Sequence, residues 1–310
     1  MGSDRLKFPP QRDFGFYQRK KHDKWRAVEA PTPALEHAVA DSHAHLHMLP
    51  DPQWELARCA ANGVDLVCTI ADPSEDDMVQ VMSFAALDDG EMPEVLLAVG
   101  VHPHNARLYS DELEQQLVQL AGHDAVRVLG EVGLDYHYDF SPRDCQRDVF
   151  RRQIRLAKQL GLPLSLHLRS GAEAEEGGED DAHGQAFRIL EEEGFPEAGT
   201  LLHCCALGPG ALQPWIQAGC YIAYGGALTF KNAEAAREGA RLVPDDRLLL
   251  ETDSPYMTPE PMRGAGCTPA HVVFTAELLA QVRGARPGSA REALLRQIHG
   301  NTERFLGCSR

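Results

Sequence analysis

Six side chains of the kinds that bind divalent metals follow short apolar runs in this 310-residue sequence: His43, His45, Glu131, His167, His203 and Asp253. His43 and His45 are two residues apart, so in an extended segment both imidazoles point to the same side and can hold one ion together. A single histidine in such a place is more often a packing residue than a ligand. Because all six fall where a strand is expected to end, the joint pattern predicts a metal site.

The ligand types indicate which metals fit and what chemistry they could support. Imidazole together with carboxylate suits Zn, Mn, Co or Mg, and no thiolate is required. We predict two divalent ions about 3.5–4 Å apart, with the ligands divided as follows: His43, His45 and Asp253 on one ion, His167 and His203 on the other, and Glu131 between them. Such a pair can lower the pKa of a shared water toward ~7 and stabilise an in-line displacement. Glu131 and Asp253 are the predicted catalytic residues, with Asp253 taking the proton of the water.

Eight apolar segments that alternate with helical stretches must position these side chains, a rhythm typical of βαβ units and a parallel sheet. The predicted strands cover residues 39–41, 66–70, 96–101, 126–130, 164–168, 200–203, 220–224 and 247–251. No dinucleotide-binding glycine pattern or P-loop follows any of them, and eight repeats favour a closed barrel. The predicted fold is therefore a single-domain α/β protein, a (β/α)8 TIM barrel, in which the carboxyl ends of the strands meet at one mouth.

Two of the intervening helices can be delimited from the sequence. In residues 144–160 apolar side chains recur at helical spacing, and Gly161 is expected to end that helix. Near the C-terminus, Ser289 and Glu292 predict a capping box, and Gly300 is expected to end the helix that they begin.

Composition narrows the class of protein. The chain is 43% hydrophobic and 25% charged, which suits an ordinary globular core, and no stretch reaches the roughly 18 apolar residues that a membrane span needs. Its eight cysteines contain no CxxC pair, so reduced thiols and a cytoplasmic location are expected. A formal net charge of −16 argues against broad, non-specific binding to nucleic acid but not against a nuclease that binds phosphate through cations.

Two segments depart from the barrel pattern. Residues 1–37 are predicted to be an N-terminal extension, since residues 1–36 carry eight Lys or Arg against five Asp or Glu, with interleaved aromatics. Such a segment is either an arm on the domain, mobile or docked, or a binder of single strands. The hydrolase domain is then expected to cover 38–310. Within it, residues 171–184 form an acidic insert that cannot bury a core and is predicted to be a solvated loop at the mouth.

From residue 41 to residue 306 the sequence resembles the TatD-type metal-dependent hydrolases, the deoxyribonuclease branch of the amidohydrolase-like superfamily. The resemblance rests on ordered motifs, which read DSHAHL at 41–46, VGVHPH at 99–104, GEVGLDY at 130–136, ETDSPY at 251–256 and GNT at 300–302. It implies a nuclease that hydrolyses phosphodiesters, with 3′→5′ exonuclease action on DNA, and it implies the same six residues as metal ligands. Single-stranded DNA or a DNA 3′ end is then the expected partner, and no obligate protein partner is inferred.

The resemblance also suggests residues that contact the substrate. His102 and His104 are expected to face it. Arg169 and Lys231 are reasonable phosphate contacts, because a charged donor can hold a non-bridging oxygen. The alternatives are a salt bridge from Arg169 to the acidic loop, and an ordinary solvated side chain for Lys231.

Departures from the family pattern lie where substrate specificity is set. The family's Asn-Glu-Pro is absent after Arg263, and CCAL follows as residues 204–207 where the family has CFSG after its histidine. Other substrates for the same metals therefore stay open, namely a non-nucleic or aminoacyl-type carboxylic ester, a lactone or an amide. A non-catalytic metal-binding protein is a third alternative, against which the complete ligand set argues.

Overall fold

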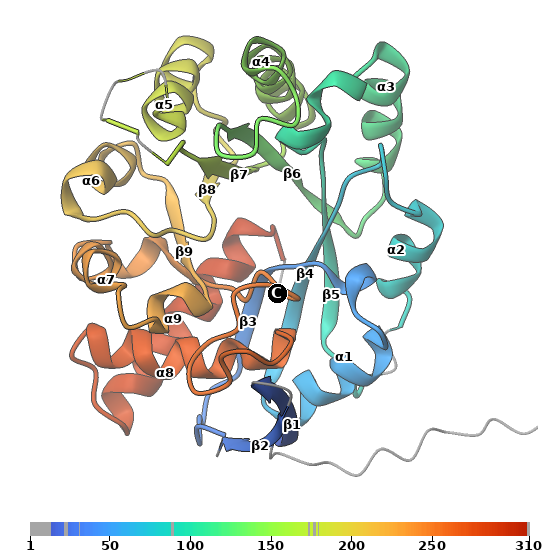
Figure 1. Ribbon diagram of the computed structural model, residues 1–310. Coiled ribbons are helices and arrows are strands. Elements are labelled where there is room, and N and C mark those ends of the chain that lie inside the picture. The colour runs from blue at the N-terminus through green and yellow to red at the C-terminus, as the bar shows by residue number, and fades with distance from the viewer. Residues whose placement is uncertain are drawn as a thin grey trace, which may run out of the picture.

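The computed structural model describes residues 32–87, 90–172, 174–175, 178 and 180–308, together with the backbone of 14–21 and 24–30. Eight parallel strands pair in chain order, each with the next, and helices surround them (Figure 1). The strands are β3 (Val39–Ala44), β4 (Val64–Ala71), β5 (Glu94–Val99), β6 (Val126–Asp135), β7 (Leu164–Arg169), β8 (Thr200–Leu202), β9 (Tyr221–Tyr224) and β10 (Leu248–Leu250). The predicted (β/α)8 barrel is confirmed, and each predicted strand overlaps an observed one.

The barrel closes at its carboxyl-terminal mouth, between the segments that follow the first and the last strand of the sheet. The His45 amide donates to the Ser254 carbonyl oxygen at 2.8 Å, and the Asp253 amide donates to the His43 carbonyl oxygen at 2.9 Å. Beneath them the buried Asp41 carboxylate accepts hydrogen bonds from the Thr252 amide at 3.0 Å and the Thr252 hydroxyl at 2.6 Å. The contacts that close the barrel therefore also hold three of the predicted metal ligands in place.

Helices follow most of the strands and form the outer layer (Figure 1). They are α1 (Pro52–Ala61), α2 (Met78–Phe84), α3 (Asp111–Leu120), α4 (Arg143–Leu160), α5 (Ala182–Glu193), α6 (Pro209–Gln217), α7 (Glu234–Ala240), α8 (Val272–Val282) and α9 (Ser289–Phe305). Short 3-10 turns complete the layer: η1 (Leu46–Met48), η2 (Pro103–Leu108), η3 (Gly226–Thr229), η4 (Asp245–Arg247) and η5 (Pro269–His271). As predicted, α4 ends before Gly161, which adopts a left-handed conformation with φ 68°.

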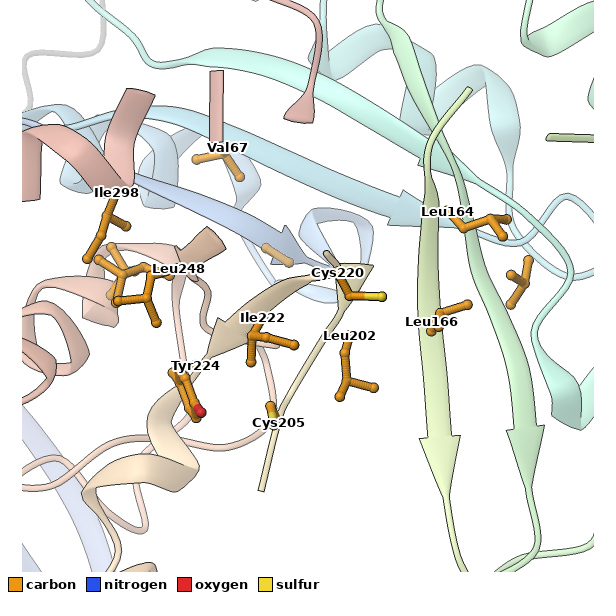
Figure 2. Packing of buried hydrophobic residues seen from close by; sticks show 14 of the residues in the cluster. Val67, Leu164, Leu166, Leu202, Cys205, Cys220, Ile222, Tyr224, Leu248 and Ile298 are labelled. Atoms are coloured by element: carbon orange, nitrogen blue, oxygen red, sulfur yellow. The ribbon is translucent and has the colours of Figure 1, made fainter. Parts of the chain in front are cut away.

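Side chains alternate along the strands between two hydrophobic clusters. In β4, Leu66, Cys68 and Ile70 join one cluster, while Val67 and Ala71 join the other. This period of two is what a strand imposes when both of its faces are buried. The first cluster fills the barrel and the second lies between the barrel and its helices, where Figure 2 shows strand residues such as Ile222 and Leu248. Burial of each such aliphatic side chain stabilises the fold by about 1.5–3 kcal/mol.

The C-terminal helix differs from the prediction at both ends. Gly288 occupies its N-cap with no side-chain hydrogen bond, and α9 continues through Gly300 to Phe305. Glu292 forms no capping box because its carboxylate accepts hydrogen bonds from the amides of Glu36 and His37. Buried Asn301 donates to two carbonyl oxygens of the segment leading into β10, and these contacts offset the cost of about 1 kcal/mol for a glycine within a helix.

The predicted extension and acidic loop are described only in part. Residues 1–13, 22–23 and 31 lie outside the described residues, as do residues 173, 176, 177 and 179 of the loop. Within the extension, β1 (Phe14–Lys21) and β2 (Lys24–Ala30) form an antiparallel hairpin. The domain boundary at residue 38 stays a prediction. Among the helices of the described chain, none combines the length and the apolar character that a membrane span requires.

Candidate metal centre

The six predicted ligands converge at the carboxyl-terminal mouth of the barrel. A cavity of about 810 Å³ opens there, and five of the six line it: His45, Glu131, His167, His203 and Asp253. His43 lies beneath them, fully buried. Because the six side chains come from five different strands of the barrel or from the segments that follow them, only the closed barrel can bring them together.

Glu131 on β6 lies at the centre of the cluster. Its Oε1 atom is 2.6 Å from His167 Nδ1 and 2.7 Å from His203 Nε2. Its Oε2 atom is 3.4 Å from His43 Nε2 and 3.9 Å from His45 Nε2. One carboxylate oxygen thus faces each half of the predicted ligand set, the arrangement that a bridging carboxylate requires.

Asp253 completes the half of the cluster that contains His43 and His45. Its Oδ1 atom is 3.5 Å from His45 Nε2. The residue has φ 57°, in the left-handed region that non-glycine residues rarely adopt, and functional sites often hold such conformations. The adjoining backbone hydrogen bond to His43 maintains this conformation.

The buried nitrogens of this cluster test whether a cation fits it. Neither ring nitrogen of His43 has a hydrogen-bond partner among the described residues, although the ring is fully buried and stacks on His203 at 3.9 Å between centroids. His203 Nδ1 also lacks one. Leaving such nitrogens unpaired costs about 1–3 kcal/mol each. Imidazole and carboxylate donors whose ligating atoms lie within 4.8 Å of one another therefore fit borderline divalent cations well.

Electrostatics favour the protonation state that coordination requires for two of the predicted ligands, Glu131 and His43. Burial by itself raises the pKa of Glu131, but the imidazoles of His203, His43 and His167 outweigh burial and hold that pKa well below its usual value. Burial, with the charge of His203, lowers the pKa of His43. The carboxylate is therefore ionised and His43 is neutral at neutral pH, as coordination requires. Burial by itself lowers the pKa of His45, His167 and His203, but the neighbouring carboxylates outweigh burial and raise it, so a bound cation must displace protons from these rings.

Three carboxylates that the ligand prediction did not name contact the histidines of the cavity or the backbone next to them. Asp135 Oδ2 lies 2.8 Å from His104 Nε2 and 3.1 Å from His167 Nε2. Glu251 Oε1 accepts a hydrogen bond from the Cys204 amide, and its Oε2 lies 3.8 Å from His203 Nδ1. Asp72 accepts from the His102 amide at 3.0 Å. Asp135 and Glu251 belong to the sequence motifs at the strand ends, so their positions could have predicted a supporting role. No motif in the sequence pointed to Asp72.

The predicted substrate contacts fall into two groups. His102, His104 and Arg169 line the cavity, whereas the exposed Lys231 is absent from the described residues that line it. The guanidinium of Arg169 lies 4.7 Å from the centroid of the Tyr138 ring. The described part of the acidic loop pairs with another arginine, since Asp180 is 2.7 Å from Arg143.

Comparisons with known proteins agree with this geometry. The model of the family described as TatD related DNase matches residues 40–307. The chain is 33% identical over 246 residues to the metal-dependent hydrolase YabD of Bacillus subtilis, which covers 78% of this chain and 90% of that protein. It is also 33% identical over 214 residues to the human 3'-5' RNA nuclease TATDN2, covering 67% of this chain and 26% of that protein.

A solved structure supports the same assignment. YjjV, a TatD homolog from Escherichia coli, matches with a TM-score of 0.75 and 25% sequence identity, covering 87% of this chain and 98% of that one. The family model spans the whole barrel and includes all six residues of the metal cluster. The chain therefore belongs to the TatD family of metal-dependent hydrolases.

Proposed function

We propose that this protein is a divalent-metal-dependent phosphodiesterase, a deoxyribonuclease that removes nucleotides from the 3′ end of DNA in the cytoplasm. The observation that carries the proposal is the placement of Glu131, whose two oxygens face separate groups of imidazoles. The nuclease activity in the printed name of the human relative and the family description support the same reaction class.

Two divalent ions would be held in the division that the sequence predicts, with Mg, Mn, Zn and Co as the candidates. When bound, such ions supply Lewis acidity and lower the pKa of a coordinated water. The ligands for the first are His43, His45 and Asp253, those for the second are His167 and His203, and Glu131 is shared.

Asp253 is the residue that accepts the proton of the attacking water. Burial raises the pKa of its carboxyl group, but the hydrogen bond from His45 and the charge of His203 outweigh burial and lower that pKa. The carboxylate is consequently ionised at neutral pH and lines the cavity, where it can reach a water beside the substrate phosphorus.

His102 presents a hydrogen-bond donor to the substrate. Its Nδ1 atom accepts from the His104 amide at 3.2 Å, so the proton of the neutral ring is on Nε2. Burial, together with the charge of His167, holds the pKa of His102 well below its usual value, which keeps the ring neutral. His102 Nε2 lies 3.9 Å from Glu131 Oε1, at the position where it can donate to a phosphate oxygen near the ligands.

One experiment tests reaction class, substrate and polarity together. Metal-stripped protein is supplied in turn with Mg, Mn and Zn, with a chelator control, and incubated with end-labelled single-stranded DNA. The expected result is metal-dependent, stepwise shortening from the 3′ end. Absence of cleavage by protein that has bound two equivalents of metal would contradict the proposal.

The second candidate is hydrolysis of a carboxylic ester, lactone or amide by the same residues. One observation favours it: of the described residues that line the cavity, Arg169 alone is a lysine or arginine, whereas Tyr138, Phe140 and Tyr256 line it as well. Comparing chromogenic phosphodiesters with chromogenic carboxylic esters separates the two. Bound metal without hydrolysis of either would leave a non-catalytic metal-binding role.

A further inference from the structure

Exposed apolar side chains gather at the rim of the metal-site cavity. Nine large hydrophobic side chains are exposed in the described part of the chain, and five of them line this cavity: Met48, Tyr138, Phe140, Tyr256 and Met257. Apolar surface concentrated in one concave place indicates a ligand with apolar faces of its own. Phosphate and metal contacts alone do not account for it.

The first wall of the cavity follows β6 and consists of planar groups. The rings of Tyr138 and Phe140 are stacked, with 5.4 Å between centroids and 12° between planes, and they are 47% and 57% exposed. The Arg169 guanidinium lies over the Tyr138 ring, and the His104 ring meets Phe140 edge-on at 4.7 Å. His104 in turn contacts Asp135, the carboxylate behind His167, so this wall adjoins one half of the metal cluster.

The second wall adjoins the other half of the cluster. Tyr256 is 51% exposed, and its ring lies 6.1 Å from that of His45. Its hydroxyl donates to the Met48 sulfur at 3.7 Å, which orients the ring. Aromatic walls therefore adjoin both halves of the metal cluster, one next to His45 and the other next to His104.

We propose that these walls form a base-stacking subsite, in which the Tyr138–Phe140 wall and the Tyr256 wall hold the nucleobases that flank the phosphodiester at the metal centre. This inference rests on the proposed function and extends it to the part of the substrate that is recognised. Every nucleobase has a π face, so stacking on aromatic rings is tolerant of sequence, and an arginine in the stack adds a cation–π contribution.

The charge of the molecule gives a physical reason for such a subsite. A net charge of −16 provides no general attraction for a polyanion, and Arg169 is the one lysine or arginine among the described residues that line the cavity. Beyond the phosphate contacts of the bound cations, further affinity for DNA is then expected from contacts that do not depend on charge. Stacking on exposed rings beside the centre supplies them.

The test compares single-stranded DNA that carries bases with the same strand in which base-free tetrahydrofuran residues replace the last two nucleotides at the 3′ end. Kinetics are measured with the metal-loaded enzyme, and binding by fluorescence anisotropy in an Asp253→Asn background. The variants are Tyr138→Leu and Tyr256→Leu, and Tyr138→Phe and Tyr256→Phe retain each ring. Leu242→Ala, an exposed apolar residue outside the cavity, is the matched control.

We expect each leucine variant to raise KM and Kd for the base-bearing strand by about 5- to 100-fold. The preference for that strand over the base-free one should shrink accordingly, while the phenylalanine variants and Leu242→Ala keep it. If the leucine variants lose affinity equally for both strands, or lose none, the base-stacking subsite is overturned. Cleavage by the parent enzyme would still uphold the proposed function in that case. Conversely, ring-dependent binding without cleavage would uphold the subsite and overturn the nuclease assignment.

Discussion

At the scale of single residues, the candidate metal centre depends on groups that water would otherwise solvate. Glu131 is buried among four imidazoles, and within the described part of the chain neither ring nitrogen of His43 has a hydrogen-bond partner. Burying a carboxylate is expensive unless it is paired, and here the pairing partners are themselves metal-ligand types. Replacing either the carboxylate or one of the imidazoles therefore changes the charge balance of the whole cluster.

Asp253→Asn tests the general base without straining the backbone. Asparagine tolerates the left-handed conformation that Asp253 adopts at φ 57°, so the fold should survive. We expect kcat to fall by at least about 100-fold, because the amide cannot accept the proton. Asp246→Asn, an exposed carboxylate in η4, is the matched control. A folded Asp253→Asn protein with near-normal kcat would refute the assignment.

Asp135→Asn tests a residue that acts through its neighbours. Its Oδ2 atom is shared by His104 and His167, which fixes the orientation of both rings. Loss of such a supporting carboxylate commonly costs about 10- to 100-fold in metal affinity. In a calorimetric titration we expect the ion bound by His167 to weaken by that factor, with the other ion affected much less. Equal weakening of both ions would indicate a general loss of structure.

At the scale of elements, β6 must pass very close to β7 for Glu131 and His167 to meet. Gly133 has φ 148°, and a Cβ atom there would lie 2.1 Å from the His167 carbonyl oxygen. Only glycine is therefore compatible with this approach of the two strands. The glycine in the motif after Glu131 reflects a packing requirement of the barrel.

The junction between η5 and α8 makes a separate prediction about stability and pH. The Thr268 amide donates to Nδ1 of the buried His271, and burial, with the charge of Arg58, lowers the pKa of His271 to about 3. The folded-state pKa is below the unfolded value of about 6.5, so this stability is complete above about pH 6.5. It is lost as the pH falls from about 6.5 toward 3, by up to about 1.4 kcal/mol per pH unit.

The urea midpoint measured against pH checks this prediction. The midpoint of the parent protein should fall more steeply than that of His271→Gln between pH 6.5 and pH 4, because glutamine does not titrate. His123→Gln, at an exposed histidine, should retain the steep dependence of the parent. Parallel curves for the parent and His271→Gln would show that His271 makes no such contribution.

At the scale of the whole molecule, the ligands join distant parts of the barrel. The six predicted ligands come from β3, β6 and β7 and from the segments that follow β3, β8 and β10, so bound metal would connect elements from the two ends of the sheet. An ion that binds only the folded state stabilises it by about 4 kcal/mol when its concentration is 1,000 times Kd.

Metal removal should therefore lower the melting temperature of the whole domain in one transition. We expect a chelator to lower Tm by several degrees and Mn or Zn to restore it, with two equivalents bound per chain. In Glu131→Gln the shift should be much smaller, because the shared carboxylate is lost. A parent Tm that does not respond to chelator and metal would contradict the ligand assignment.

Much of this architecture could be predicted from local patterns. The alternation of short apolar segments with helical stretches predicted eight strands, and each overlaps an observed one. The convergence of the six predicted ligands was predictable because strand ends share one mouth in any parallel barrel. Lys231 shows the limit of this reasoning: a basic residue near a motif can still lie outside the cavity.

The sequence by itself determined the barrel, the types of the ligands and the mouth at which they meet, because these follow from local periodicity and from residue chemistry. Only the tertiary structure decided which oxygen of Glu131 faces which histidines, that Asp135 and Glu251 support the cluster, and that two aromatic walls flank it. The physical reason is distance along the chain. Asp41 and Thr252 close the barrel across 211 positions, and such a contact depends on strand register and curvature that no local pattern encodes.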